Sequence, residues 1–395
     1  MSKLQQHEDK QHALLSASGS ARWLSCTPSA RFEEQFPRQT STYADEGTAA
    51  HELAELYAKF FLEEASVETF EKQLEVFSKN QYFNAEMQEH AEAYATYICR
   101  WLYTLKEKCE DAFAELESKK LDFSEWVPEG FGTGDCIIVS DTILEVIDFK
   151  YGKGVKVEAE NNSQMMLYAL GALNRYGALY NIEKIVLRII QPRVSEIPSS
   201  YELAVSELLA WAENTVRPRA KLAFAGEGEF APSEEACRFC RGKEQCVART
   251  QQNLALFDEP EAKLITPEKA GKILAKAGDI KNWLADLECL VTKTLFEGKE
   301  VPGWKLVEGR SNRKYVDEEA VASAMIAAGH MEELLYDRKL LGITAMESAF
   351  GKKTVGDILK DLIHKPAGRP TLAPAGDKRK AVMPTTLILE AFNDE

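Results

Sequence analysis

The sequence predicts an α/β fold in which a small mixed β-sheet is flanked by helices, with an added, mainly helical C-terminal region. Three observations support this prediction. Apolar residues recur at helical spacing between residues 46 and 65. Two runs rich in β-branched residues follow at 134–139 and 142–150. A helical pattern at 161–177 then leads to another strand pattern at 184–193, and this alternation is typical of a mixed sheet covered by helices.

Length and charge limit the classes of protein that the chain can belong to. The chain has 395 residues and a net charge of −15. This length predicts two or three domains. The negative charge excludes a protein that coats nucleic acid through overall basicity, but it is compatible with a local basic groove. The sequence has neither a membrane-length apolar run nor an apolar secretion signal, so we expect no membrane contact and a cytoplasmic location.

Helical patterns dominate the first part of the chain. A helix is expected to begin near Ser18, and residues 33–46 are interpreted as a polar loop. Thr48 is expected to cap the second helix. The apolar stripe of that helix comprises Leu53, Leu56, Tyr57, Phe60 and Phe61. Residues 82–119 are predicted to form one long helix.

The two β-rich runs are separated by Ser140-Asp141, so they are predicted to pair as a hairpin. Residues 202–225 are predicted to form a helix that ends near Gly226. Beyond it we expect a helix at 266–297 that starts at Thr266-Pro267, a hairpin or strand at 301–317, helices at 317–363 and an extended tail at 365–382.

The hairpin carries the residues that point most directly to chemistry. Side chains alternate along a strand, so Asp148 and Lys150 are expected to share one face. Pairing of the strands would bring Asp135, which follows Gly132-Thr133-Gly134, close to Asp148. Two adjacent carboxylates repel unless a cation lies between them, and oxygen ligands favour Mg²⁺ or Mn²⁺.

Three residues on the neighbouring helices extend this set. His51 is a candidate metal ligand, with Glu55 one turn later as its partner. Gln164 and Tyr168 are four residues apart and share a helix face that could line the same cleft. Each residue also has an ordinary interpretation: the aspartates could cap or solvate a strand end, and the others could simply pack.

Three cysteines form a C-x2-C-x5-C cluster at Cys237, Cys240 and Cys246. In a cytosolic protein such a cluster suggests a metal site, whereas its ordinary alternative is a set of structural thiols. The best candidate for a fourth ligand is Cys26. The remaining cysteines are interpreted as small buried hydrophobic residues, namely Cys99, Cys109, Cys136 and Cys289.

The ordered set of a helix His, a G-x-D strand, a D-x-K strand and a Q-x3-Y helix resembles the PD-(D/E)XK nuclease superfamily in its RecB-like branch. The resemblance implies a restriction-endonuclease-like core. It implies that His51, Asp135, Asp148 and the Phe149 carbonyl bind Mg²⁺ or Mn²⁺ and that Lys150 is catalytic, with Gln164 and Tyr168 in the same site. The chain has Asp148 where the family often has Glu.

The cysteine layout resembles the iron–sulfur members of that branch, such as AddB-type helicase-nuclease subunits and CRISPR-adaptation exonucleases. This implies a structural [4Fe–4S] cluster on Cys26, Cys237, Cys240 and Cys246, with Zn²⁺ as the alternative. The expected organisation is a flexible N-terminus at 1–20, a nuclease domain at 21–250, a helical accessory domain at 255–364 and a tail at 365–395.

The resemblance implies a metal-dependent deoxyribonuclease, an exonuclease, that acts in phage or bacterial recombination, replication or repair. The alternatives are a catalytically silent module that binds DNA ends or a partner, and a zinc-stabilised adaptor. The C-terminal region is a candidate surface for a replication or recombination protein. Candidates for a DNA path are Arg22, Trp23, Lys153, Lys156, Arg188, Arg193, Arg310, Arg313 and Lys314.

Overall fold

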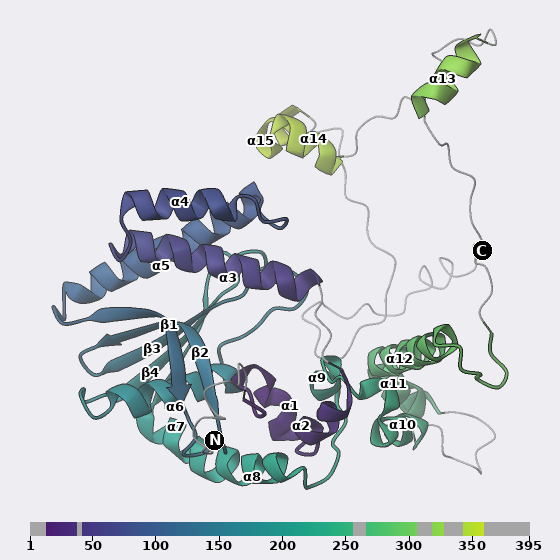
Figure 1. Ribbon diagram of the computed structural model, residues 1–395, viewed down its shortest axis with the longest axis horizontal. Helices are drawn as coiled ribbons and strands as arrows, with labels where there is room; N and C mark the ends of the chain where they lie inside the picture. Colours follow the sequence, from purple (N-terminus) through teal and green to yellow (C-terminus); the bar gives the residue numbers. More distant parts are fainter. Residues whose placement is uncertain (1–12, 38–41, 256–265, 306–317, 328–342, 359–395) are drawn as a thin grey trace, which may run out of the picture. The chain divides into compact units, whose positions relative to one another are not determined.

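The computed structural model describes residues 13–37, 42–255, 266–305, 318–327 and 343–358. The chain divides into two compact units, Met1–Pro302 and Gly303–Glu395. In the second unit, most of the described residues form helices, which agrees with the predicted helical C-terminal region. These helices are α13 (Glu318–Ala327), α14 (Ile343–Phe350) and α15 (Lys352–Ile358) (Figure 1). The domain boundaries expected from the sequence stay predictions.

The first unit is built on a five-stranded sheet with the order β1-β2-β3-β4-β5. Its strands are β1 (Phe113–Asp122), β2 (Phe131–Ser140), β3 (Ile143–Phe149), β4 (Lys184–Ile190) and β5 (Ser199–Ala204). Strands β3 and β4 are parallel, and the other neighbouring pairs are antiparallel. The predicted α/β fold with a mixed sheet and flanking helices is therefore confirmed.

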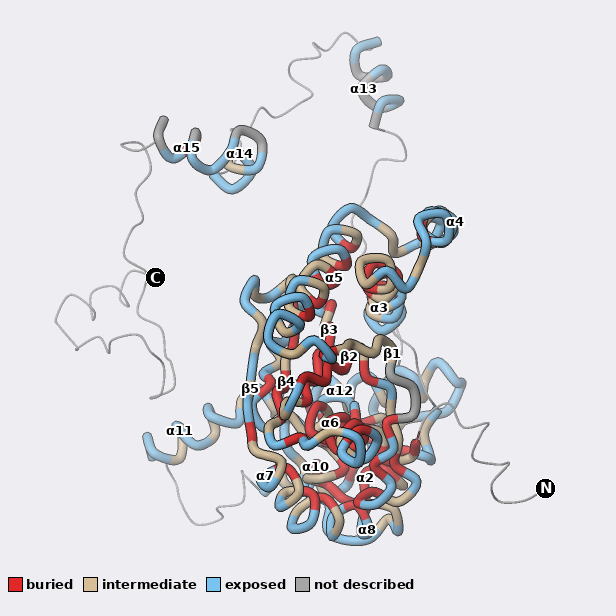
Figure 2. Tube along the Cα trace, turned by 90° about the vertical axis from the view of Figure 1, so that its left-hand side faces the viewer, coloured by how far each residue is buried: buried red, intermediate tan, exposed pale blue. Residues whose placement is uncertain are grey.

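Helices cover both faces of this sheet (Figure 1). On one face, α6 (Ser163–Tyr176) crosses from β3 to β4 and shares a buried core with α7 (Val205–Trp211) and α8 (Arg217–Ala225). On the other face, α3 (Thr42–Phe61) and α5 (Ala85–Lys106) form a second core with the sheet, next to α4 (Val67–Phe77). Figure 2 shows the buried residues gathered in the central strands and the helices that cover them.

The strand residues are divided between the two cores by their alternation. Ile137 and Val146 pack against α6, whereas Cys136, Ile138 and Ile147 face α3 and α5. Because both faces are covered, the central strands are apolar almost throughout. This burial explains why the hairpin was recognisable in the sequence.

Several predicted boundaries were wrong. The long helix expected at 82–119 ends at Lys106, and β1 follows at Phe113–Asp122. The helix expected at 202–225 is preceded by β5, which ends at Ala204. Both strands lie at sheet edges, where charged side chains are favoured and the alternation of apolar residues is weak. Helix α3 begins at Thr42, so Thr48 lies within it rather than at its cap.

Other local predictions were right. Residues Asp141 and Thr142 form the hairpin turn, one position later than expected. Thr266 caps α11 (Pro267–Ala275) by accepting a hydrogen bond from the Lys269 amide, with Pro267 at the first helical position. Residues 306–317 and the predicted tail at 365–382 lie outside the described residues. None of the helices in the described ranges is long and apolar enough to cross a membrane.

Candidate functional site

Strands β2 and β3 bring the two predicted carboxylates together. The hydrogen-bonded pairing of these strands ends at Cys136 and Ile147. Beyond this point, the Phe149 amide donates its hydrogen bond to a side chain of β2 instead of to the backbone: Asp135 Oδ2 accepts it at 2.8 Å. The N–H and C=O of an extended residue point the same way, so the Phe149 carbonyl also faces Asp135.

His51 reaches this position from the middle of α3. Its Nδ1 lies 3.2 Å from Asp135 Oδ1, and its ring packs edge-on against Phe149. Burial alone would lower the pKa of His51, but the Asp135 carboxylate outweighs it, and the net pKa is raised. Burial likewise opposes ionisation of Asp135, yet His51 and the Phe149 amide together lower the pKa of that carboxyl. The contact is therefore an ion pair whenever His51 is protonated, and the Asp135 carboxylate favours that protonated form.

Asp148 and Lys150 form the second charged pair of the site. The Lys150 Nζ lies 2.9 Å from Asp148 Oδ2 and donates a hydrogen bond of 3.2 Å to Oδ1. The Asp148 side chain is 4% exposed, and its Oδ2 accepts no hydrogen bond of normal geometry. Burial raises the pKa of Asp148, against the effect of Lys150. Burial opposes the charge on Lys150, but Asp148 raises the pKa of the amine.

Helix α6 adds the predicted glutamine and tyrosine. The Gln164 Oε1 accepts a hydrogen bond of 3.4 Å from Lys150, while its Nε2 donates to Asp148 Oδ1 at 3.5 Å and to the Tyr168 hydroxyl at 3.2 Å. Burial raises the pKa of Tyr168 to about 12, so its hydroxyl stays protonated. A Cβ at Gly132 would lie 2.7 Å from the Tyr168 ring, which explains the glycine at this position.

All the residues predicted for the catalytic centre thus meet at one end of the sheet. They are joined through Asp135, Phe149, Asp148 and Lys150. As they stand, however, no three His, Cys, Asp or Glu side chains among the described residues are arranged to hold a metal ion. The carboxylate oxygens of Asp135 and Asp148 are instead in contact with His51, Lys150 and a backbone amide. The donor types suit a hard divalent cation.

A cavity of about 290 Å³ opens beside Asp135, between α3, α5 and the strands β1 and β2. It is lined by His51, Glu55 and Tyr94 among others. Tyr94 was not among the predicted site residues, because a tyrosine in the apolar stripe of a helix looks like an ordinary core residue. Only the structure shows that its buried hydroxyl has no hydrogen-bond partner among the described residues. Glu55 is paired with Lys59 rather than with His51.

The four predicted cysteine ligands also come together. Cys26 follows α1 (Ser20–Ser25), and Cys237 lies in α9 (Glu234–Arg238). All four are buried, free thiols that line one small cavity with Phe32 and Phe230. The Ala231 amide donates a hydrogen bond of 3.4 Å to Cys26 Sγ. Burial raises the pKa of Cys26 and Cys237, and that of Cys240 to about 11.

The interpretation of the other four cysteines holds only in part. Cys136 is fully buried in the core, as expected, and Cys99 and Cys109 are half-buried. Cys289 is exposed, which contradicts the expectation of a buried residue. It lies in α12 (Ala277–Phe296), where helical periodicity alone did not reveal which face meets the solvent.

The cations predicted to contact DNA are engaged with the protein itself. Lys153 pairs with Glu86, and Lys156 with Glu158. The remaining described cations are also paired: Arg22 with Glu33, Arg188 with Glu145, and Arg193 with Glu46 and Glu86. Trp23 was expected as a flat exposed side chain, but it is 2% exposed and donates a hydrogen bond to the Ser16 carbonyl. Arg310, Arg313 and Lys314 lie outside the described residues.

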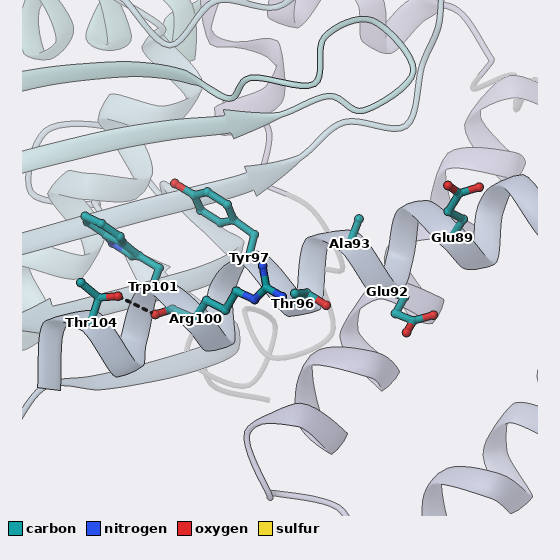
Figure 3. A pocket seen from close by; sticks show the side chains of 8 residues that line it. All are labelled: Glu89, Glu92, Ala93, Thr96, Tyr97, Arg100, Trp101 and Thr104. Carbon is teal, nitrogen blue, oxygen red and sulfur yellow. Dashed lines mark hydrogen bonds between the residues drawn. The ribbon is translucent and has the colours of Figure 1, made fainter. Parts of the chain in front are cut away.

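A shallow groove on α5 is lined by none of the residues predicted for the catalytic centre (Figure 3). Tyr97 and Trp101 point from this helix toward the strands. Trp101 donates a hydrogen bond of 2.7 Å to the buried Glu145, and the Arg188 guanidinium stacks on its ring at 4.7 Å. Arg188 therefore holds α5 against the sheet through Glu145 and Trp101, rather than facing solvent as a candidate for DNA contact.

Two solved structures resemble the chain weakly. "Crystal structure of SSO0001" has 16% sequence identity and a TM-score of 0.27, and the match covers 62% of this chain and 93% of the other. "Crystal Structure of LHK-Exo in complex with dAMP" has 15% identity and a TM-score of 0.24, with coverage of 46% and 93%. At these scores neither likeness bears on function. The family model described as "Protein of unknown function (DUF2800)" matches residues 12–380. The match spans most of the chain, and the protein therefore belongs to the DUF2800 family.

Proposed function

We propose that the protein is a metal-dependent deoxyribonuclease that hydrolyses phosphodiester bonds, an exonuclease of the RecB-like type. One observation carries the proposal: Asp135, Asp148 and Lys150 meet at the ends of β2 and β3 in one network. Asp148 is buried, and its Oδ2 lies 2.9 Å from the Lys150 ammonium but accepts no hydrogen bond of normal geometry among the described residues, which is costly for a buried carboxylate oxygen. A hard cation between the two carboxylates would satisfy it.

Mg²⁺ or Mn²⁺ would be held by Asp135, Asp148, His51 and the Phe149 carbonyl. When bound, such an ion polarises the scissile phosphate and lowers the pKa of a bound water. Ligation requires His51 to be neutral, so its ion pair with Asp135 must rearrange on loading.

The other residues act on the substrate and on each other. Lys150 keeps its positive charge, since Asp148 raises its pKa, and it offsets the charge that develops on the phosphate. Gln164 accepts a hydrogen bond from Lys150 and donates one to Asp148, so it holds both side chains in place. The Tyr168 hydroxyl accepts from Gln164 and fixes the orientation of its amide.

The four cysteines would hold a [4Fe–4S] cluster, with Zn²⁺ as the alternative. As they stand, the four thiols are not arranged to hold a metal ion, but four buried thiols around one cavity and an amide that donates to a sulfur are the donors that such a group needs. We assign it a structural role, because the thiols lie apart from the carboxylates and connect α1 to α9. The cellular role would be in DNA recombination, replication or repair of a phage or bacterium, with a protein partner on the C-terminal region.

A second candidate function is a catalytically silent module that binds DNA ends or a partner. The observation in its favour is the charge balance of the site. His51 and Lys150 neutralise the two carboxylates without a metal ion, and each described cation proposed for a DNA path is paired with a glutamate.

An assay on end-labelled single- and double-stranded DNA separates the two functions. Wild type would be compared with Lys150→Met in Mg²⁺, Mn²⁺ or EDTA, with Lys184→Met as a matched control on the sheet surface, where it pairs with Glu202. We expect metal-dependent degradation that falls by roughly a hundredfold or more in Lys150→Met and is unchanged in the control. A folded, metal-loaded wild type that cuts no DNA end would favour the silent module.

A further inference from the structure

A groove of about 610 Å³ connects the catalytic network with the cysteine site. Its lining includes Gln164, which is bonded to Lys150 and Asp148, and Phe239, which lies in the cysteine cluster. We call it the Phe239 groove. Sites for single small ligands measure roughly 300–1,000 Å³, so the Phe239 groove has the size of a site for one nucleoside.

Direct contacts hold the walls of the Phe239 groove together. Ser20 on α1 and Ser163 on α6 share a hydrogen bond of 2.6 Å. Arg22 on α1 pairs with Glu33 at 2.9 Å, and Glu33 accepts a hydrogen bond of 2.8 Å from the Arg241 amide. Helix α1 also packs beside α9 (Figure 1). The segments that carry Gln164 and Phe239 are therefore fixed to one another through α1.

Phe239 is an exposed aromatic residue between two buried cysteines. It is 77% exposed, whereas Cys237 and Cys240 are each 9% exposed. The Cys240 amide donates a hydrogen bond of 3.1 Å to the Cys237 carbonyl, which closes a tight turn around Phe239. The backbone of Phe239 is thus held in place while its ring stays open to the groove. Such a ring is a surface on which a planar ligand can stack.

The charges of the Phe239 groove favour an uncharged ligand over a phosphate. Its lining contains the cations Arg22, Lys156 and Arg238 and the carboxylates Glu158, Glu160, Glu234 and Glu235. The cations are paired, Arg22 with Glu33, Lys156 with Glu158 and Arg238 with Glu234. No positive charge is in excess in this lining, so a phosphate would gain little attraction there.

The neutral polar residues of the Phe239 groove suit the edge of a nucleobase. Asn161 lines it at the turn that leads into α6, where its φ of 53° is in the left-handed region that asparagine adopts more readily than most residues. Its Oδ1 accepts a hydrogen bond of 3.4 Å from the Tyr201 hydroxyl. A side-chain amide carries both donors and an acceptor, which match the mixed donors and acceptors of base edges.

We propose that the Phe239 groove binds an unpaired base of a DNA strand and that this base stacks on the Phe239 ring. The inference rests on the proposed nuclease function and names its substrate as a single-stranded end. A strand whose scissile phosphate lies beside Lys150 would pass Gln164 and place a neighbouring base in the groove. A base inside a duplex is stacked and paired, so only an unpaired base offers a free face to the ring.

Affinities for a labelled single strand of about 12 nucleotides and for a blunt duplex, measured by fluorescence anisotropy in Ca²⁺, test this proposal. Phe296→Ala is the matched control, because Phe296 is 76% exposed in α12 and does not line the groove. We expect Phe239→Ala to weaken the Kd for the single strand roughly tenfold, because one stacking contact is lost. Phe239→Trp should bind like wild type, and neither Phe239→Ala on the duplex nor the control should change.

A strand that lacks one base shows whether the lost affinity belongs to a base. The abasic nucleotide is moved along the strand one position at a time. At one position it should weaken binding by wild type roughly tenfold but not weaken Phe239→Ala further, because both changes remove the same contact. Losses that simply multiply at every position would overturn the proposal.

The iron or zinc content of each variant is measured as well, since Phe239 lies between two proposed ligands. If Phe239→Ala loses metal, Phe239→Leu replaces it, because leucine keeps the apolar bulk and removes only the aromatic ring. An unchanged Kd for the single strand, or an equal loss on single strand and duplex, would refute the stacking role. Cleavage of the same DNA is assayed beside binding. If Lys150→Met cuts as well as wild type, the proposed function fails, whereas an active wild type with unimpaired Phe239→Ala refutes only the Phe239 groove.

Discussion

At the scale of single residues, the site is an arrangement of compensated charges. Asp135 is balanced by His51, and Asp148 by Lys150, so that no net charge is buried at the end of the sheet. Such pairs keep buried carboxylates ionised, since an uncompensated one would take up a proton instead. A cation between the carboxylates would have to compete with His51 and Lys150, so the proposed metal binding would exchange one set of partners for another.

The His51–Asp135 pair gives the metal-free protein a pH-dependent stability. The pKa of His51 is raised above its ordinary value of 6.5. Stabilisation by this pair is therefore complete below about pH 6.5 and is lost as the pH rises through the higher pKa of the folded state. In EDTA, His51→Gln should lower the melting temperature more at pH 6 than at pH 8. Expressed as free energy of unfolding, the loss at pH 6 should exceed the loss at pH 8 by on the order of 0.5 kcal/mol, because the pair is partly exposed and screened.

The same measurement on His90→Gln serves as the control, since His90 forms no ion pair with any described residue and its ring packs against Tyr151. A loss of stability in His51→Gln that is equal at both pH values would show that His51 contributes only its packing on Phe149.

At the scale of elements, what the sequence could predict depended on burial. The hairpin and α6 were predictable because both are buried and carry unbroken periodicity. The edge strand β1 was not, because its run FAELESKKLD is as charged as a helix surface. The same limit applies to the site. Asp135, Asp148 and Lys150 follow from strand alternation, whereas no sequence pattern reveals the cavity beside Asp135 that α3 and α5 form with the strands.

The position of α6 depends on a close approach to β1. A Cβ at Gly171 would lie 2.7 Å from the backbone carbonyl carbon of Leu121, which cannot move aside as a flexible side chain could. We expect Gly171→Ala to lower the free energy of unfolding by about 1–3 kcal/mol in chemical denaturation. Gly271→Ala in α11 is the matched control, because nothing lies within 4 Å of its added Cβ. The control should be neutral or up to about 1 kcal/mol more stable. An equal change in the free energy of unfolding in both variants would mean that helix propensity, and not the close approach to Leu121, determines the effect at Gly171.

At the scale of the whole first unit, the N-terminal helices are tied to a segment far along the chain. Thr27 donates a hydrogen bond of 2.7 Å to the Glu227 carbonyl, and Arg31 donates one of 2.8 Å to the Phe224 carbonyl. Glu33 accepts one of 2.8 Å from the Arg241 amide. These bonds join the segments without any metal ion. A group bound by the four cysteines would therefore reinforce an existing closure, and its loss should loosen these segments rather than unfold the sheet.

Hydrogen exchange measured by mass spectrometry can test this local effect. Cys237→Ser removes one buried thiol of the proposed cluster site, whereas Cys289→Ser removes an exposed one in α12. We expect Cys237→Ser to lose its iron or zinc and to exchange faster in residues 20–37 and 231–255, while β2, β3 and α6 keep their protection.

The control should keep both its metal and its protection. Wild-type protein without iron or zinc would refute the metal site. Loss of the metal with unchanged exchange would refute its structural role. It would show that the hydrogen bonds between the N-terminal helices and the later segment hold the two together without the metal.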